Sequence, residues 1–262
     1  MLQALSYIVV GLMIVALFLL IHICKMMRMY LVLIDTKIEF RRFTFAYFRT
    51  TLINLVIPFK LGEIYRAVVF YRLSGSLKIG VLSVIVDRFF DTLALVLIII
   101  PLILLYPDTL SFVTVMLSVF LVVIVFIYRV FPPAYRYLNN YIIINRTSKR
   151  SMAVLRVLSI LRVWYDYVRN LVSGRYSVML LLSFGAWIVE GILLLILSRY
   201  VGISFGAREF CEYITSILSS GHETSIQKPY TWMCIVLIAV MTIISGTVYF
   251  IKGGKPSERP GS

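Results

Sequence analysis

The sequence predicts an all-α polytopic membrane protein. Of its 262 residues, 61% are hydrophobic and only 15% are charged, whereas a soluble domain of this length would carry many more charges on its surface. Several apolar runs reach about 20 residues, the length that a helix needs to cross roughly 30 Å of hydrocarbon. The alternating polar and apolar pattern of outer-membrane barrel strands is absent from the sequence.

Five segments are long and apolar enough to cross a membrane: 5–24, 79–105, 110–131, 177–200 and 230–251. The first run has no basic n-region and no small-residue cleavage site, so we interpret it as a span and not as a signal peptide. We expect a single membrane domain over residues 1–252, followed by a flexible tail at 253–262.

The positive charge of the chain predicts its orientation. The net charge is +14, and basic residues are dense in 129–175, recur in the tail, and follow the first span as Lys25, Arg28, Lys37, Arg41, Arg42 and Arg49. Basic loops face the cytoplasm, where anionic headgroups attract them, and no motif favours nucleic acid as a partner. We therefore expect a multi-pass protein of the plasma membrane, with its N-terminus outside and its C-terminus inside.

Two stretches fit neither a span nor a simple loop. Residues 41–73 predict two short helices broken around Pro58 and Gly62, because proline disfavours helix at and before its own position. Each half is too short to span, so we expect a re-entrant hairpin that enters from the cytoplasmic side. The stretch 203–220 has a similar character near the outer face. Two such elements entering from opposite sides would form an inverted repeat.

The basic region 133–175 contains an amphipathic segment at 151–171. Its apolar residues recur at helical spacing: Val154, Val157, Leu158, Leu161, Tyr165 and Val168. This pattern predicts a helix lying at the inner membrane interface, and a helix packed beneath the bundle is the alternative.

Charged residues interrupt two of the spans. Asp87, Arg88 and Asp91 lie in the second span, where each unpaired charge costs about 2.5–3.5 kcal/mol at mid-membrane. Arg88 and Asp91 are three residues apart and can pair, and the surplus carboxylate suits a further cation, for which Arg66 is the candidate. A structural clasp and a functional cluster both fit this pattern. Glu190, in the fourth span, predicts a structural hydrogen bond.

Glu63 and Arg66 follow the break in the hairpin. A helix starting at Gly62 would present free backbone N–H groups and the positive end of its dipole close to Arg66. This combination suits a phosphate group. A loop with incidental charges is the alternative.

The spacing Asn54-x3-Pro58-x3-Gly62-Glu63-x2-Arg66, followed by Asp87-Arg88-x2-Asp91, resembles the lysylphosphatidylglycerol synthase transmembrane region, also called the flippase-like membrane family. Gly206 and Glu209 match the end of a later P-x3-G-x2-E element of that family, although its proline is missing here. The resemblance implies a lipid-handling membrane domain in which these residues contact the substrate: Asn54, Pro58, Gly62, Glu63, Arg66, Asp87, Arg88, Asp91, Gly206 and Glu209. We find no aminoacyl-transferase domain of the kind that makes lysyl-lipid in the best-known members, so such synthesis is not expected of this chain.

The leading functional hypothesis is a lipid translocase without covalent chemistry, cofactor or metal. Its substrate would be an anionic or aminoacylated phospholipid, or a polyprenyl-phosphate-linked lipid. Arg66 and Arg88 would hold the phosphate headgroup, while Glu63, Asp87 and Asp91 orient them or exchange protons. A homo-oligomer is compatible with this hypothesis.

The alternative from a different class is a non-catalytic membrane scaffold or regulator of an envelope lipid- or glycan-modifying enzyme, which would then be a partner protein. An intramembrane enzyme is less favoured, because the sequence has no HExxH motif, no clustered histidines and no Ser-His arrangement.

Overall fold

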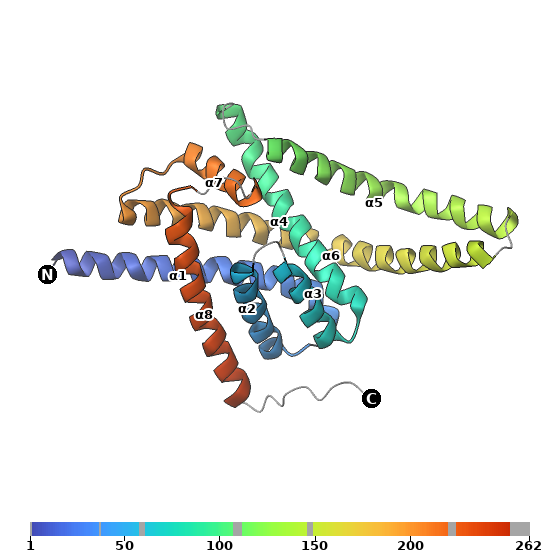
Figure 1. Cartoon of the computed structure of the whole chain (residues 1–262), viewed down its shortest axis with the longest axis horizontal. Coiled ribbons are helices and arrows are strands. Elements are labelled where there is room, and N and C mark those ends of the chain that lie inside the picture. The colour runs from blue at the N-terminus through green and yellow to red at the C-terminus, as the bar shows by residue number, and fades with distance from the viewer. Residues whose placement is uncertain are drawn as a thin grey trace. The chain divides into compact units, whose positions relative to one another are not determined.

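The computed structural model describes residues 2–36, 38–57, 61–106, 112–145, 149–219 and 224–251. Within these ranges all regular structure is helical, which confirms the predicted all-α class. The elements, labelled in Figure 1, are α1 (Leu2–Leu33), the short 3-10 helix η1 (Ile34–Thr36), α2 (Phe40–Val56), α3 (Leu61–Ser74), α4 (Leu77–Leu105), α5 (Phe112–Asn145), α6 (Lys149–Val201), α7 (Ala207–Ser219) and α8 (Gln227–Ile251).

Five of the described helical segments are long and apolar enough to cross a membrane, as predicted: Tyr7–Thr36, Leu77–Leu105, Val115–Ile144, Ser173–Val201 and Gln227–Ile251. Many large apolar side chains on these helices, such as Leu104, Phe126 and Ile243, are exposed on the outside of the protein. Such surfaces would be unfavourable in water and are suited to lipid tails. The chain is a multi-pass membrane protein.

The first span is longer than predicted. We expected Lys25 and Arg28 in a loop after a span at 5–24, and this prediction is wrong, because α1 continues to Leu33. Both cations form ion pairs with carboxylates of other helices, at 2.8 Å to Glu190 and to Asp87. Neutralisation by these partners allows the helix to carry the two charges inside an apolar segment.

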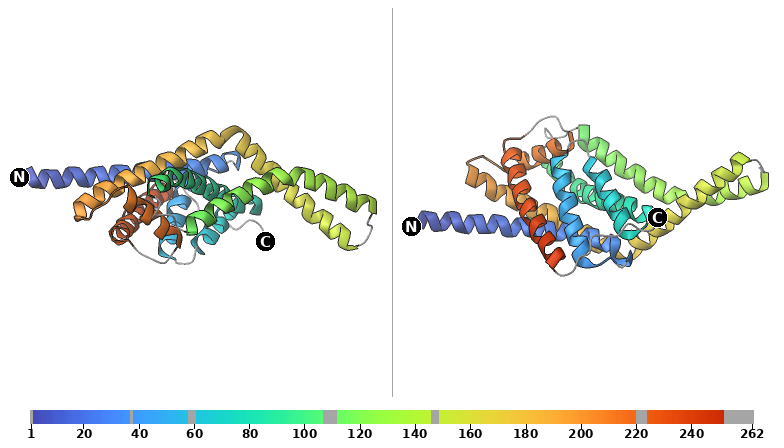
Figure 2. Two further views of the ribbon diagram at one scale, coloured as in Figure 1. Left: turned by 90° about the horizontal axis from the view of Figure 1, so that it is seen from above. Right: turned by 60° about the horizontal axis from the view of Figure 1, so that its bottom comes forward.

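The chain divides into two compact units, one comprising residues 1–109 and 178–262 and the other residues 110–177. The second unit contains α5 and the first part of α6, which form a helical hairpin (Figure 2). The ring of Tyr165 on α6 lies 5.1 Å from that of Tyr128 and 5.0 Å from that of Phe131 on α5. Aromatic packing therefore holds this pair of helices together.

Residues 133–175 continue two spanning helices. Residues 133–145 form the end of α5 and residues 149–175 the beginning of α6, so the amphipathic stretch 151–171 is not a separate helix. One glycine in a helix costs only about 1 kcal/mol, and Gly174 does not interrupt α6. Val154, Val157 and Leu161 are exposed, whereas Leu158 is buried. The location of this segment at the membrane interface stays a prediction, as does the single membrane domain over residues 1–252.

The predicted broken element is present as α2 and α3 in the first unit. With 17 and 14 residues, the two helices are about 26 Å and 21 Å long, and each is shorter than the hydrocarbon core. The break falls between Val56 and Leu61; Pro58 lies outside the described residues, as does the tail 253–262. Re-entry into the bilayer stays a prediction.

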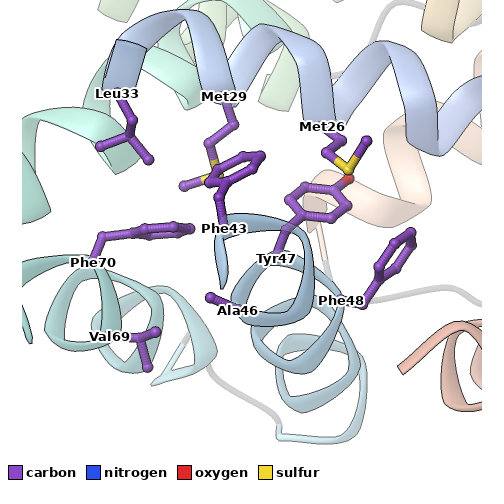
Figure 3. Close-up of a cluster of buried hydrophobic side chains, with 9 residues drawn as sticks. All are labelled: Met26, Met29, Leu33, Phe43, Ala46, Tyr47, Phe48, Val69 and Phe70. Atoms are coloured by element: carbon purple, nitrogen blue, oxygen red, sulfur yellow. The ribbon is translucent and has the colours of Figure 1, made fainter. Parts of the chain in front are cut away.

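A cluster of apolar side chains fixes this helix pair against α1. Figure 3 shows Met26, Met29 and Leu33 of α1 facing Phe43 and Tyr47 of α2 and Phe70 of α3, with Ala46, Phe48 and Val69 completing the cluster. Met29, Phe43 and Phe70 are fully buried. Close van der Waals packing of these side chains holds α1, α2 and α3 together.

Glycines bring the neighbouring helices close to the α2–α3 pair. A Cβ atom built on Gly80 of α4 would lie 2.6 Å from the carbonyl oxygen of Ala67 on α3, and one on Gly246 of α8 would lie 3.0 Å from the ring of Phe45 on α2. A larger residue at Gly80 would therefore push α4 away from α3. The close approach places the charges of α4 beside those of α3.

The stretch 203–220 contains one short helix, α7, after an irregular segment. Cys211, Tyr213 and Ile214 are buried, while Arg208 and Glu212 on the other face are exposed and form an ion pair at 3.6 Å. The helix is therefore amphipathic, and its apolar face packs inside the first unit. Whether this stretch enters the membrane stays a prediction.

Candidate functional site

Charged side chains from three helices meet inside the first unit and form a connected set, which we call the ion-pair network. Its polar contacts extend to Ser183 of a fourth helix, α6. The charged members are Arg28 of α1, Glu63 and Arg66 of α3, and Asp87, Arg88 and Asp91 of α4. Three guanidinium groups thus face three carboxylates, and the network is close to neutral.

Arg28 lies at the centre of the network. Its Nε donates to Asp87 Oδ1 at 2.8 Å, and its Nη1 donates to Asp91 Oδ1 at 2.8 Å and to Ser183 Oγ at 2.7 Å. The Arg28 side chain is only 3% exposed. A buried charge is tolerated only when it is paired and hydrogen-bonded, and Arg28 meets both conditions. It clasps α1, α4 and α6 together.

Sequence reasoning did not assign Arg28 to the site, because it placed this residue in a loop. Two signals pointed to it nonetheless. The second span carries more carboxylates than cations, and the apolar pattern of the first helix continues beyond Lys25 through Met26, Met29 and Leu33. A continuing helix would have kept Arg28 inside the protein.

Arg66 is buried but incompletely paired. Its Nη1 lies 3.6 Å from Asp87 Oδ2, and its Nη2 donates to Thr51 Oγ1 at 3.2 Å. Its Nε is buried and has no hydrogen-bond partner among the described residues. Burial, followed by the positive charge of Arg88, lowers the pKa of Arg66. This guanidinium therefore retains a donor that an anion would satisfy.

Arg88 and Glu63 form the more open edge of the network. Arg88 Nε lies 2.8 Å from Glu63 Oε1, and the two side chains are 38% and 25% exposed. The contact is an ion pair that is not aligned as a hydrogen bond, since Arg88 Nε has no hydrogen-bond partner. The predicted contact between Arg88 and Asp91 is present but longer, at 3.9 Å. Glu63 is thus the closer partner of Arg88.

Asn54 and Gly62 mark the place where α2 and α3 touch. A Cβ atom built on Gly62 would overlap the Cα atom of Asn54 and would lie 2.8 Å from its Cβ atom. Only glycine permits this approach without a shift of the backbone. The helix begins within one residue of the predicted start, and the contact positions Glu63 and Arg66 beside α4.

Glu190 takes part in a second, separate group of polar side chains. Its Oε2 accepts a hydrogen bond from Lys25 Nζ at 2.8 Å, and its Oε1 accepts one from Tyr213 at 3.1 Å. The predicted structural hydrogen bond is confirmed. The basic partner lies 165 residues earlier in the chain, which is why no partner was visible near Glu190 in the sequence.

Gly206 and Glu209 lie at the beginning of α7. The backbone N–H of Gly206 donates to Glu209 Oε2 at 2.8 Å, an arrangement that satisfies a donor at the helix N-terminus. Among the described residues, no ion pair connects Glu209 with the ion-pair network. The structure gives Glu209 a capping role, and its contact with substrate stays a prediction.

Fold and site together define a class of protein: a helical, multi-pass membrane protein with an ionised network buried among its spans. The family model of the lysylphosphatidylglycerol synthase TM region matches residues 1–222. The chain belongs to this family, as the motif around Gly62 and Asp87 predicted. No curated protein and no solved structure was found to match it.

Proposed function

We propose that the protein is a lipid translocase that binds and moves an anionic or aminoacylated phospholipid, or a polyprenyl-phosphate-linked lipid, without covalent chemistry. Family membership supports a role related to membrane lipids. The observation that carries the proposal is the buried guanidinium of Arg66, whose Nε has no partner among the described residues. Its ion-pair partner Asp87 precedes Arg88 in the chain, and Arg88 forms the partly exposed pair with Glu63.

The members of the network would have different roles. Arg28, Asp87 and Asp91 saturate one another and act as a structural clasp. Arg66 and Arg88 have donors to spare, and guanidinium groups bind phosphate oxygens through charge-assisted hydrogen bonds. An incoming phosphate would compete with Glu63 for Arg88. Glu63 would therefore act as the group that a headgroup displaces.

Vesicle reconstitution tests this proposal. The purified chain is inserted into liposomes with a labelled phosphatidylglycerol, a labelled lysyl-phosphatidylglycerol or a labelled polyprenyl phosphate, and movement between leaflets is followed by quenching of the outer label. We expect Arg66→Ala to reduce movement at least tenfold through the loss of one charge-assisted contact with the headgroup. Glu63→Gln should also reduce movement, because no carboxylate then displaces the headgroup from Arg88 on release.

Arg162→Ala is the matched control, because Arg162 forms a partly exposed ion pair with Asp166 four residues away on the same helix. It removes an arginine outside the network and should leave movement unchanged. Unaltered transport in both network variants would contradict the assigned roles of Arg66 and Glu63.

A membrane scaffold or regulator of an envelope-modifying enzyme is the second candidate. The exposure of Val154, Val157 and Leu161 favours it, since a partner helix would cover such a surface. This function requires a partner protein that copurifies in mild detergent. It also predicts that charge substitutions in the network affect folding alone.

A further inference from the structure

A cavity of about 450 Å³ lies between α2, α3 and the end of α8, all within the first unit. Volumes of roughly 300–1,000 Å³ are usual for ligand sites. We call it the arginine pocket, after Arg42, Arg49 and Arg72 in its wall. On α2 the pocket residues include positions 42, 45 and 49, and on α3 they include positions 65 and 72. These spacings correspond to single faces of each helix.

The arginine pocket is distinct from the ion-pair network. Neither Glu63 nor Arg66 is among its lining residues, although both lie on the same helix as Tyr65 and Arg72. Glu63 and Arg66 project toward α4, where they meet Arg88 and Asp87. The two sites thus use different faces of α3.

The charge of the pocket is uncompensated. Among the described residues, the charged side chains that line the pocket are all arginines, and no carboxylate lines it. Within the described part of the chain, none of the three arginines forms an ion pair with an acidic side chain. Arg49 Nε is buried there without a hydrogen-bond partner. A buried, unpaired donor on a charged group is unfavourable unless a ligand satisfies it.

Aromatic rings hold Arg49 in place. Its guanidinium carbon lies 5.7 Å from the ring centre of Phe45 and 5.8 Å from that of Tyr65. Contacts of this kind orient a guanidinium without neutralising its charge. Phe45 in turn stacks on Tyr249 of α8, with ring centres 5.7 Å apart and planes at 8°. Arginines and aromatic rings therefore lie side by side in the lining of the pocket.

The rim of the pocket continues into an apolar outer surface. Phe250 of α8 is 60% exposed and Val68 of α3 is 40% exposed, and both line the cavity. A free inorganic anion would make no favourable apolar contacts with this rim. A phosphate attached to an acyl or prenyl chain would gain contacts with the arginines and also with the rim, because its chain can lie along the apolar surface.

We propose that the arginine pocket is a second lipid site, which binds the phosphate group of an anionic lipid through Arg42, Arg49 and Arg72 and holds its chain against Phe45 and Tyr249. The site is independent of the translocase proposal, since a scaffold could bind a lipid there as well. Phosphate is the shared chemistry, and either a lipid or a soluble phosphate could supply it.

The test measures binding and not transport. The full-length protein in mild detergent is titrated with dioctanoyl phosphatidic acid, with inorganic phosphate and with dioctanoyl phosphatidylcholine, and heat of binding is recorded. We expect phosphatidic acid to bind and the other two to bind at least tenfold more weakly. Inorganic phosphate binding as tightly as phosphatidic acid would overturn the assignment to a lipid. Phosphatidylcholine binding as tightly would overturn selection of an anionic headgroup.

Substitutions then locate the site. Arg42→Gln combined with Arg72→Gln should weaken phosphatidic acid binding by roughly tenfold or more through loss of charge-assisted contacts, whereas Arg66→Ala should leave one binding event of unchanged affinity. Binding lost with Arg66→Ala but retained in the double variant would assign the lipid to the ion-pair network and overturn the proposal.

Photo-crosslinking covers the case in which a variant fails to fold. A phosphatidic acid with a diazirine in its acyl chain is added to the unmodified protein, and labelled peptides are mapped by mass spectrometry. Labels on the segments around Phe45 and Tyr249 would support the site. Labels confined to other helices would overturn it.

Discussion

Arg28 illustrates how a single side chain can connect helices that are distant in sequence. Its hydrogen-bond partners Asp87 and Ser183 lie 59 and 155 residues away. These three groups are buried and the further partner Asp91 is only 15% exposed, so removal of the cation would leave Asp87 and Asp91 without their main counter-charge. Loss of one partner of a buried ion pair costs about 3–5 kcal/mol.

Arg28→Ala should therefore lower the midpoint of thermal unfolding in detergent far more than Arg162→Ala does, and Arg28→Lys should fall in between because it retains the charge but loses the fork of donors. The Arg162–Asp166 pair is the control, since it is solvent-accessible and its charges are screened. Equal midpoints for Arg28→Ala and Arg162→Ala would show that the clasp does not stabilise the fold.

Arg66 and Arg88 show what local spacing could and could not predict. The i, i+3 relation of Arg88 and Asp91 predicted their pairing, and the structure shows the contact at 3.9 Å. Arg66 was predicted as the further cation of this cluster, and it lies 3.6 Å from Asp87. The closer partners, Arg28 for Asp91 and Glu63 for Arg88, come from other helices. Spacing along one helix identifies neighbours on that helix and contains no information about which faces of two helices meet.

The α2–α3 pair is the element on which the network depends. Gly62 lets the two helices approach at Asn54, and the following turn of α3 carries Glu63 and Arg66 toward α4. The positions of proline and glycine in the sequence predicted this pair of short helices. The contact between Gly62 and Asn54 was not visible, because it depends on the angle at which the helices cross.

Gly62→Ala should destabilise this element by roughly 1–3 kcal/mol, as overpacking of a close contact does. The new methyl group overlaps backbone atoms, which cannot rotate away as a flexible side chain can. Gly11→Ala is the control, because a Cβ atom there meets nothing within 4 Å. Hydrogen exchange of α2 and α3 is the measurement, and we expect faster exchange in the Gly62 variant only.

Unchanged exchange in Gly62→Ala would mean that α2 and α3 separate at little cost. The network would then not depend on their contact. Faster exchange in Gly11→Ala as well would indicate a general effect of substitution and not a local overlap.

For the molecule as a whole, orientation in the membrane is the main prediction. The basic residues that remain outside the first span, such as Arg41, Arg42 and Arg49, favour a cytoplasmic α2–α3 pair. The stretch that contains α7 would then face the outside. An inverted arrangement of these two elements would be compatible with alternating access.

Cysteine labelling in intact cells measures this orientation. In a background without Cys24, Cys211 and Cys234, we expect Leu61→Cys to be protected from an impermeant maleimide and Arg208→Cys to react. Both native positions are exposed on the protein, so access of the reagent is decided by the membrane. Reaction at both positions from the same side would rule out the inverted arrangement.

The sequence by itself determined the helical class, the five spans and the broken element, because these features depend on local properties: run length, apolar content, and the positions of proline and glycine. It also marked Asp87, Arg88 and Arg66 as charges that require partners. Only the tertiary structure decided which residues pair with these charges. Lys25 and Arg28 form ion pairs with other helices, Glu209 caps a helix, and three arginines that have no acidic partner in the described ranges line one cavity. The physical reason is that pairing and cavity formation depend on which helix faces meet, and that is a property of packing between distant segments.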